Sequence, residues 1–318
     1  MSLRTSFEWA THTYQSTPAT ELDIFKPSTH TSSSPPRKTL IMFHGGGLVT
    51  GQRQGMVPED VAIPLLVSGW IVISADYSLF PQADGLSLLR DISALETWLT
   101  THASAEGIDT THVAVIGASA GVFLAVLAAA HWKTVRPQAL LDYYGMLDLG
   151  APWYSADKSS SPPVVIGIPT DDLEEAEFAA ILGSNEVLTN DLVVFGVTPP
   201  GGRFRFFLWA VKQGVLLDFL FGRHQSQRER GMTEVPEDMH SQLLPFDLVK
   251  SMPPTWVIHG GADSVVLPTD SRRFVELLKA EGIQVEYTEV EGADHGLVGV
   301  PPRQGVEQAV EFLEKWVV

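Results

Sequence analysis

The chain has 318 residues, 44% of them hydrophobic, which is enough to build one large α/β domain with a substantial core. Its 38 acidic and 21 basic residues give a formal net charge of -17, so nucleic acids and anionic membranes are disfavoured as partners. The absence of cysteine excludes disulfides, thiolate metal ligands and a cysteine nucleophile, which leaves Ser, His, Asp and Glu to carry any chemistry.

The sequence carries no pattern typical of export or of a membrane anchor. Residues 1–10 lack the continuous apolar core of a signal peptide, and neither Asn185 nor Asn190 lies in a glycosylation sequon. The long apolar run at residues 204–221 is short for a membrane span and interrupted by charged residues, so it predicts a buried or lid helix. We therefore expect a soluble, cytoplasmic protein without a membrane span.

Apolar runs and helical spacings alternate along most of the chain. Short buried runs bounded by turn residues predict strands at residues 7–14, 22–25, 38–43, 70–75, 113–116, 139–144, 255–259 and 284–290. Helical spacing of apolar side chains predicts helices at residues 56–67, 85–103, 122–130, 271–280 and 305–317. This alternation predicts an α/β fold with a mostly parallel sheet, helices on both faces and a ligand site at the carboxyl ends of the strands.

The alternation stops between residues 150 and 249. Proline-rich loops and two helical runs, residues 173–182 and 204–221, replace it over a length that is too great for a simple connection. We therefore expect one α/β core made of residues 1–149 and 250–318, with residues 150–249 inserted as a mainly helical cap. The aromatic residues of the insertion either form its own core or line an apolar pocket beneath a lid, and both interpretations stay open.

The stretch that organises the chain is Gly117-Ala118-Ser119-Ala120-Gly121, because a buried run precedes it and a helical run follows at once. A sharp strand-to-helix turn holds its central residue in a strained conformation and needs small neighbours. Gly117 and Gly121 supply that room, which leaves the hydroxyl of Ser119 projecting at the carboxyl end of a strand. The pattern indicates a nucleophile; the alternative is a serine in an ordinary loop.

A second glycine-rich stretch, His44-Gly45-Gly46-Gly47, follows the predicted strand at residues 38–43. Three consecutive glycines after a strand leave backbone N–H groups free to point at a ligand, which is typical of a loop that stabilises an anion. A flexible turn is the alternative interpretation.

A serine nucleophile needs a base, and the base needs an orienting acid. Asp263 follows the strand at residues 255–259, and His295 follows the strand at residues 284–290. Both are therefore expected at the sheet edge where Ser119 emerges, each in a glycine-containing loop. The order Ser, Asp, His also fits this sheet topology.

Other residues could compete for these roles. His44 and His259 lie at the same predicted edge, but each adjoins a glycine loop that sets backbone shape. Asp294 is next to His295 in sequence and poorly placed to reach its ring, whereas Asp270 is expected to cap a helix beginning at residue 271 or to support the loop. No two histidines flank a glutamate at helical spacing, so no metal site is expected.

Together these motifs resemble the hormone-sensitive-lipase branch of the α/β-hydrolases, over the chain from about residue 38 to its end. The matching residues are His44-Gly45-Gly46-Gly47, Asp76-Tyr77-Ser78-Leu79-Phe80-Pro81, Gly117-Ala118-Ser119-Ala120-Gly121, Asp263 and His295. The resemblance implies an eight-stranded core and a cap built from the insertion together with the amino terminus.

The resemblance also implies roles for single residues. Ser119 would be the nucleophile, His295 the base and Asp263 its partner. The oxyanion hole would be formed by the N–H groups of Gly46, Gly47 and Ala120. Leu48 and Ala118, which adjoin these groups, would line the substrate pocket.

The sequence departs from the family pattern near the nucleophile and in the second motif. It has Ala118 where an acidic residue is common and Val122 where a second glycine is common. It also has Ser78 in place of the usual arginine and Gln82 in place of the usual glutamate. None of these changes removes a catalytic group; they bear on the acyl pocket and the substrate range.

The leading hypothesis is a cofactor-independent serine hydrolase that cleaves small carboxylic esters through an acyl-enzyme, as a monomer or a homodimer. A second hypothesis keeps the triad but assigns it to a biosynthetic enzyme that releases, transfers, cyclises or eliminates an acyl group. The unusual surroundings of the nucleophile and the aromatic insertion motivate it. A third is a small-molecule receptor on the hydrolase fold, which the presence of His295 disfavours.

Overall fold

A computed structural model describes residues 2–31, 34–192, 199–298 and 305–318. Its main feature is one eight-stranded sheet, in the order β1-β2-β4-β3-β5-β6-β9-β10. The strands are β1 (Glu8–Ser16), β2 (Ala19–Lys26), β3 (Arg37–Phe43), β4 (Ile71–Ala75), β5 (Ile108–Ala118), β6 (Ala139–Tyr143), β9 (Thr255–Gly260) and β10 (Val285–Val290). The pairs from β4 to β10 are parallel, whereas β1 and β2 form an antiparallel hairpin at one edge. The predicted fold class is confirmed.

Helices cover both faces of this sheet. One face packs against α3 (Gly85–Glu106), α4 (Gly121–His131) and α10 (Pro268–Ala280). The opposite face packs against α1 (Leu3–Ser6), α2 (Glu59–Ser68) and α11 (Val306–Trp316). The central strands are buried on both sides, which explains why they read as continuous apolar runs in the sequence.

The longest helix, α3, is capped at both ends by residues suited to those positions. The side chain of Asp84 accepts a hydrogen bond from the backbone N–H of Ser87 at 2.8 Å, and the hydroxyl of Ser87 contacts the backbone N–H of Asp84 in return. Gly107 ends the helix with φ at 73°. This reciprocal capping box and left-handed glycine satisfy free backbone groups at the two ends.

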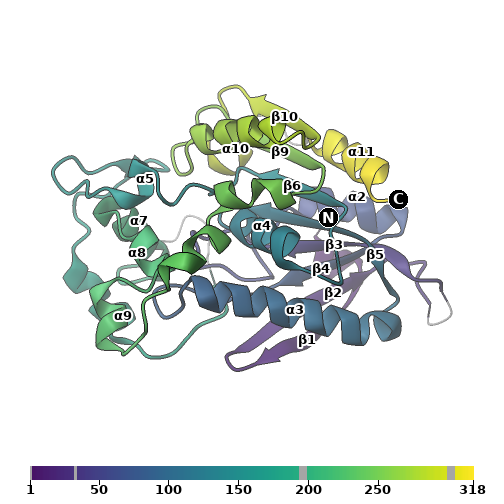
Figure 1. The fold of residues 1–318 in the computed structure, drawn as a ribbon, viewed down its shortest axis with the longest axis horizontal. Helices are drawn as coiled ribbons and strands as arrows, with labels where there is room; N and C mark the ends of the chain where they lie inside the picture. The colour runs from purple at the N-terminus through teal and green to yellow at the C-terminus, as the bar shows by residue number, and fades with distance from the viewer. Residues whose placement is uncertain (1, 32–33, 193–198, 299–304) are drawn as a thin grey trace.

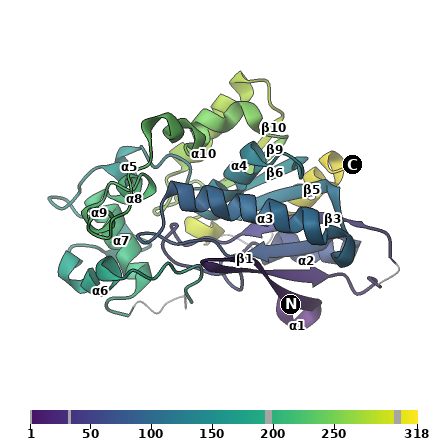
Figure 2. The same cartoon turned by 60° about the horizontal axis from the view of Figure 1, so that its bottom comes forward.

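The segment between β6 and β9 contains short elements instead of sheet strands. They are α5 (Pro152–Ser155), β7 (Val164–Val165), β8 (Ile168–Pro169), η1 (Glu175–Phe178), α6 (Ala179–Gly183), α7 (Arg203–Gln213), α8 (Leu216–Leu220), α9 (Gln225–Glu229), η2 (Glu237–Gln242) and η3 (Pro245–Ser251). Figures 1 and 2 show α5, α7, α8 and α9 gathered at one end of the main sheet. We refer to residues 150–249 as the inserted segment; its standing as a separate domain stays a prediction.

Two predicted helices of the inserted segment were wrong in extent. The run at residues 204–221 is not one helix, because Gly214 adopts a left-handed conformation and ends α7 before α8 begins. The run at residues 173–182 starts as the single 3₁₀ turn η1 and becomes α-helical only at Ala179. In both cases the apolar spacing identified helical segments, but it did not show where the helix is interrupted.

Most aromatic residues of the inserted segment pack against one another. The rings of Phe206 and Trp209 stack with centroids 5.3 Å apart, and Phe178 packs against both of them. Phe219 lies 5.8 Å from Phe206 on the other side. These side chains are buried and belong to the same hydrophobic cluster as the sheet face that α3, α4 and α10 cover. No helix within the described residues is both long and apolar enough to cross a bilayer.

Candidate active site

Ser119 lies in the tight turn between β5 and α4. Its φ is 53°, in the left-handed region that non-glycine residues rarely adopt. Backbone hydrogen bonds hold it there: its N–H donates to the carbonyl of Tyr143 at 2.8 Å, and its carbonyl accepts from the N–H of Met146 at 3.1 Å. The strained residue is therefore braced from the neighbouring strand β6, which leaves its side chain fixed in direction.

The two glycines of the motif provide the close approach that this turn needs. A Cβ atom on Gly117 would lie 2.2 Å from the backbone of Gly121, and one on Gly121 would lie 2.2 Å from the carbonyl oxygen of Phe43. Neither backbone atom can move without disturbing a central strand or the start of α4. Any larger residue at these positions would displace Ser119.

Three predicted site residues from different parts of the chain meet at this point. The Nε2 atom of His295 lies 3.1 Å from Oγ of Ser119, and its Nδ1 atom lies 2.7 Å from Oδ2 of Asp263. His295 begins the short turn η4 (His295–Leu297), and Asp263 follows β9. Both loops leave the carboxyl ends of adjacent parallel strands, so the topology alone brings them to the same edge.

The carboxylate of Asp263 is completely enclosed by donors. Its Oδ1 atom accepts from the N–H groups of Val265 and Val266, each at 2.9 Å. Its Oδ2 atom accepts from His295 and also lies 3.3 Å from Nε2 of His259. Burial raises the pKa of Asp263, but the hydrogen bonds from His259 and His295 outweigh burial and hold it well below its ordinary value. The group is an anion at neutral pH and can orient His295.

The rival acids are used elsewhere. Oδ1 of Asp294 accepts from the N–H of Ser264 at 2.9 Å and from the N–H of His295 at 2.8 Å, so Asp294 joins the two loops. The prediction that Asp270 caps a helix beginning at residue 271 was wrong, because α10 begins at Pro268 and Asp270 lies in its first turn. Asp270 instead accepts long hydrogen bonds from the 147–148 loop and from Tyr154.

The rival base His44 is enclosed in the core. Its Nδ1 atom lies 2.7 Å from the carbonyl of Gly45, and its ring stacks on Tyr77 with centroids 4.2 Å apart. Burial lowers the pKa of His44 to about 4, so the ring is neutral at physiological pH. His44 shapes the glycine loop and does not contact Ser119.

The predicted oxyanion donors are free in the structure. Among the described residues, the backbone N–H groups of Gly46, Gly47 and Ala120 have no hydrogen-bond acceptor. The loop carrying the first two is closed by a hydrogen bond of 3.0 Å from the N–H of Thr50 to the carbonyl of Gly46. A Cβ atom on Gly45 would lie 3.3 Å from Cβ of Ser119, so the loop packs against the serine. Unsatisfied donors beside a nucleophile suit an oxyanion hole.

The inserted segment reaches this loop through α7. A Cβ atom on Gly47 would lie 2.1 Å from the ring of Phe207, so the phenyl ring packs directly on the glycine backbone. Two guanidinium nitrogens of Arg203 donate to the carbonyls of Val49 and Phe80 and to Oε1 of Gln82, all at 2.7 Å. Burial lowers the pKa of Arg203 to about 10. From the sequence, Phe207 was weighed only as one of the aromatic residues of the insertion, and Arg203 was missed.

The departures from the family pattern are accommodated locally. Ser78, in place of arginine, donates from its N–H and hydroxyl to the buried carboxylate of Asp91. Gln82, in place of glutamate, accepts from Arg203 and donates to the carbonyl of Ile181 at 2.6 Å. An amide therefore joins the second motif to the inserted segment where a carboxylate is usual.

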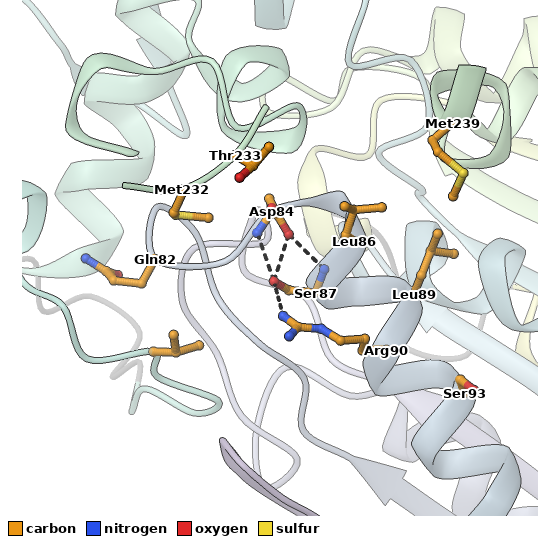
Figure 3. Close-up of a pocket in the computed structure, with 11 residues that line it drawn as sticks. Gln82, Asp84, Leu86, Ser87, Leu89, Arg90, Ser93, Met232, Thr233 and Met239 are labelled. Carbon is orange, nitrogen blue, oxygen red and sulfur yellow. Dashed lines mark hydrogen bonds between the residues drawn. The ribbon is translucent and has the colours of Figure 1, made fainter. Parts of the chain in front are cut away.

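A cavity of about 690 Å³ lies between the start of α3 and the inserted segment. Figure 3 shows Met232, Thr233 and Met239 facing Leu86 and Leu89 across it, with the hydroxyl of Ser87 bonded to Asp84 and Arg90. Ser119, Leu48 and Ala118 are not among the described residues that line it. Leu48 and Ala118 are both buried, and their assignment to a substrate pocket stays a prediction.

Tyr144 is a further neighbour of the triad that sequence reasoning missed. Its ring meets the ring of His295 edge-on, with centroids 5.0 Å apart, and its φ is 47°. Its N–H donates to the carbonyl of Ile258 at 2.8 Å. Its place directly after β6, at the carboxyl edge of the sheet, was the signal that could have identified it.

Comparisons with known proteins identify relatives over most of this chain. The chain is 28% identical over 308 residues to the non-reducing polyketide synthase Preu3 of Preussia isomera, matching 86% of this chain and 12% of that protein. It is 27% identical over 291 residues to the esterase LipC of Mycobacterium tuberculosis, matching 89% of this chain and 58% of that protein. The chain thus spans only part of these relatives.

An α/β-hydrolase superfamily protein from Enterococcus faecalis has the same fold. Its crystal structure matches with a TM-score of 0.67 at 18% identity, over 98% of this chain and 99% of that chain. A family model described as BD-FAE matches residues 22–180, half of the chain, and a prolyl oligopeptidase family model matches residues 220–318. The predicted resemblance to α/β-hydrolase esterases and lipases is confirmed, and the chain belongs to the BD-FAE family.

Proposed function

We propose that this member of the BD-FAE family is a serine hydrolase that cleaves carboxylic esters through an acyl-enzyme. One observation carries the proposal: a single imidazole, that of His295, lies 3.1 Å from the hydroxyl of Ser119 and 2.7 Å from the buried carboxylate of Asp263. A hydroxyl becomes a useful nucleophile only when a base and an orienting acid are aligned in this way. The esterase and lipase relatives support the same activity.

In the first half of the reaction, Oγ of Ser119 attacks the ester carbonyl carbon while Nε2 of His295 takes the hydroxyl proton. The oxyanion accepts hydrogen bonds from the N–H groups of Gly46, Gly47 and Ala120. Asp263 stabilises the imidazolium that has formed. The bond between carbon and the alcohol oxygen then breaks, and His295 returns the proton to the departing alcohol.

In the second half, water replaces the alcohol. His295 removes a proton from the water, whose oxygen attacks the acyl carbon, and a second oxyanion forms in the same site. Collapse of this intermediate releases the carboxylic acid and returns the proton to Ser119. No group outside the chain is needed for the proton balance. We assign residues 1–149 and 250–318 to the catalytic core and residues 150–249 to a cap over it, supported by the contact of Phe207 with Gly47.

The test is hydrolysis of a p-nitrophenyl ester series from acetate to octanoate, together with labelling by a fluorophosphonate. Turnover and labelling are expected for the wild type, and Ser119→Ala should lose both, with a fall in kcat of about 10⁴-fold or more. The exposed helix residue Ser104 provides a matched control, and Ser104→Ala should retain full activity. Full turnover by Ser119→Ala would refute the proposal.

A second candidate function is favoured by the similarity to non-reducing polyketide synthases. The same triad would cleave or transfer an acyl thioester instead of an oxygen ester. Paired N-acetylcysteamine thioesters and ethyl esters of the same acids distinguish the two. Labelling of Ser119 with turnover of thioesters alone favours this second function, whereas comparable turnover of the ethyl esters favours the first.

A further inference from the structure

His259 lies behind the triad, on β9, and is completely buried. Its Nε2 atom is 2.9 Å from the carbonyl oxygen of Val266 and 3.3 Å from Oδ2 of Asp263. Its Nδ1 atom is 2.8 Å from the hydroxyl of Ser271, which in turn lies 3.4 Å from Oδ2 of Asp142. A continuous path of contacts therefore runs from Ser119 through the half-buried His295 to Asp263, His259, Ser271 and Asp142, which are buried.

The positions of the protons on this path follow from the acceptors. The carbonyl of Val266 and the ionised carboxylate of Asp263 can only accept, so Nε2 of His259 carries a hydrogen. If the hydroxyl of Ser271 donates to Asp142, its oxygen must accept from Nδ1, which then carries a hydrogen as well. Both ring nitrogens donate in that arrangement, and the ring is an imidazolium.

Charged groups from all the elements packed against His259 bear on this assignment. Burial lowers the pKa of His259, but Asp263 and Asp142 outweigh burial and raise it above its ordinary value. Asp270 on α10 and Glu289 on β10 also act on the ring electrostatically. Arg272 on α10 pairs with Glu289 at 2.6 Å, and the ring of His295 shares Oδ2 of Asp263 with His259. Four carboxyl groups thus surround one buried imidazole.

We propose that His259 is a positioning residue of the triad: its ring, 3.3 Å from the oxygen of Asp263 that also binds His295, fixes the carboxylate electrostatically and lowers the proton affinity of His295. The inference rests on the proposed function of the triad but concerns a residue that touches no substrate. Its physical basis is that a carboxylate shared between two imidazole rings stabilises each imidazolium less than it would alone, and that like charges repel.

The experiment is the pH profile of kcat/KM with p-nitrophenyl acetate, whose acid limb reports the protonation of the base in the free enzyme. His259→Gln retains a side-chain amide donor but cannot be charged, and it should move the acid limb upward by about 0.5 to 1 pH unit. Asp142→Asn keeps an oxygen that can accept from the N–H of Gly145 but lowers the charge on His259, so it should move the limb the same way by about half as much.

A control removes a carboxylate from the next strand without touching this path. Glu286 on β10 is exposed and pairs with Lys315 at 3.2 Å, so Glu286→Gln should leave the limb unchanged. A uniform fall of kcat/KM at every pH, or a downward shift of the limb, would show a purely structural role and overturn the proposal. If His259→Gln does not fold, the shift in Asp142→Asn decides.

A second measurement separates this proposal from the proposed function. Titration of the His295 ring by NMR gives its pKa in wild type and variants whether or not esters are turned over. A higher His295 pKa in His259→Gln and Asp142→Asn supports the positioning role even if the wild type hydrolyses none of the esters. An unchanged His295 pKa in both folded variants refutes it even if the enzyme is fully active.

Discussion

The sheet edge that carries Ser119 and the inserted segment beside it are held together by different means. At the sheet edge, the backbone N–H and C=O groups of parallel strands hydrogen-bond to one another. Side chains larger than hydrogen are excluded at Gly117 and Gly121, because backbone atoms lie 2.2 Å from where a Cβ would be. In the inserted segment, long cationic side chains donate to backbone carbonyls. Arg203 reaches Val49 and Phe80, Lys212 reaches Leu173 at 2.7 Å, and Arg230 reaches Leu182 and Pro81 at 2.5 and 2.7 Å.

The difference follows from what each region lacks. A buried carbonyl without a donor costs stability, and a chain without long strands or helices leaves many of them. Arginine and lysine side chains of the inserted segment supply donors to such carbonyls, within the segment at Leu173 and Leu182 and in neighbouring loops at Val49, Phe80 and Pro81. The sheet edge should therefore be sensitive to added volume, whereas the inserted segment should be sensitive to loss of charge.

The largest effect is expected at the sheet edge, from Gly121→Ala. The added methyl group would lie 2.2 Å from the carbonyl oxygen of Phe43 and 2.7 Å from that of His44, so backbone must move. We expect a loss in the free energy of unfolding of about 3 kcal/mol or more and loss of turnover, because Ser119 shifts with the turn. Urea denaturation and ester hydrolysis measure the two.

The matched control is Gly183→Ala at the end of α6 in the inserted segment. A Cβ there meets no atom within 4 Å, so unfolding free energy and activity should stay within about 0.5 kcal/mol and about twofold of wild type. Equal destabilisation by the two substitutions would contradict the comparison.

The next effect is expected from removing a cationic anchor, by Arg203→Met. The carbonyls of Val49 and Phe80 and the amide oxygen of Gln82 would each lose a donor that lies at 2.7 Å. We expect destabilisation of about 2–4 kcal/mol, together with a fall in kcat, because Val49 follows the glycine loop. Thermal denaturation and kinetics on the acetate ester test both expectations.

Arg205, two residues further along α7, provides the control for charge alone. It pairs with Glu177 at 2.7 Å near the surface, so Arg205→Met should cost no more than about 1 kcal/mol. A larger loss from Arg205→Met than from Arg203→Met would show that surface ion pairs, and not buried carbonyls, hold the segment.

The smallest effect is expected where the two regions meet. The group that matters there is a buried acid, Asp270, instead of a buried cation. The carboxyl group of Asp270 accepts from the N–H groups of Leu147 and Asp148 and from Tyr154. Burial raises the pKa of Asp270 to about 7. Because an unfolded aspartate has a pKa of about 3.9, the folded state binds more protons between these values, and stability falls as pH rises from about 4 to about 7.

Asp270→Asn keeps the acceptor and removes this titration. The variant should therefore gain stability relative to wild type between pH 5 and pH 8, by roughly 1 kcal/mol or more. Melting temperatures of both proteins across this range measure the difference, and parallel curves would exclude Asp270 as the titrating group.

Sequence alone predicted the sheet, its order of strands and helices, and the meeting of Ser119, Asp263 and His295. This was possible because the carboxyl ends of parallel strands share one edge, so residues far apart in the chain could be placed together from topology. The role of the two glycines that flank the Ser119 turn could also be predicted, since few other arrangements need two glycines around a serine between a strand and a helix.

Much less of the inserted segment could be predicted from the sequence. Apolar spacing identified its helical runs but not the turn at Gly214, which depends on a single left-handed residue. Lys212 looked like an interruption of an apolar run and Arg203 was not singled out, because nothing in a sequence shows which carbonyls will be left without donors. His259 was weighed only as a rival base, and its link to Asp263 depends on loop geometry.

Arg203 has a consequence for protein engineering. Its guanidinium joins the loop after Gly47 to the second motif at Phe80 and Gln82, so it closes two core loops from outside the core. Exchange of residues 150–249 between relatives would remove the hydrogen bonds of Arg203 unless the incoming segment places an equivalent donor there. A chimera without this donor would carry a new inserted segment together with a loosened glycine loop.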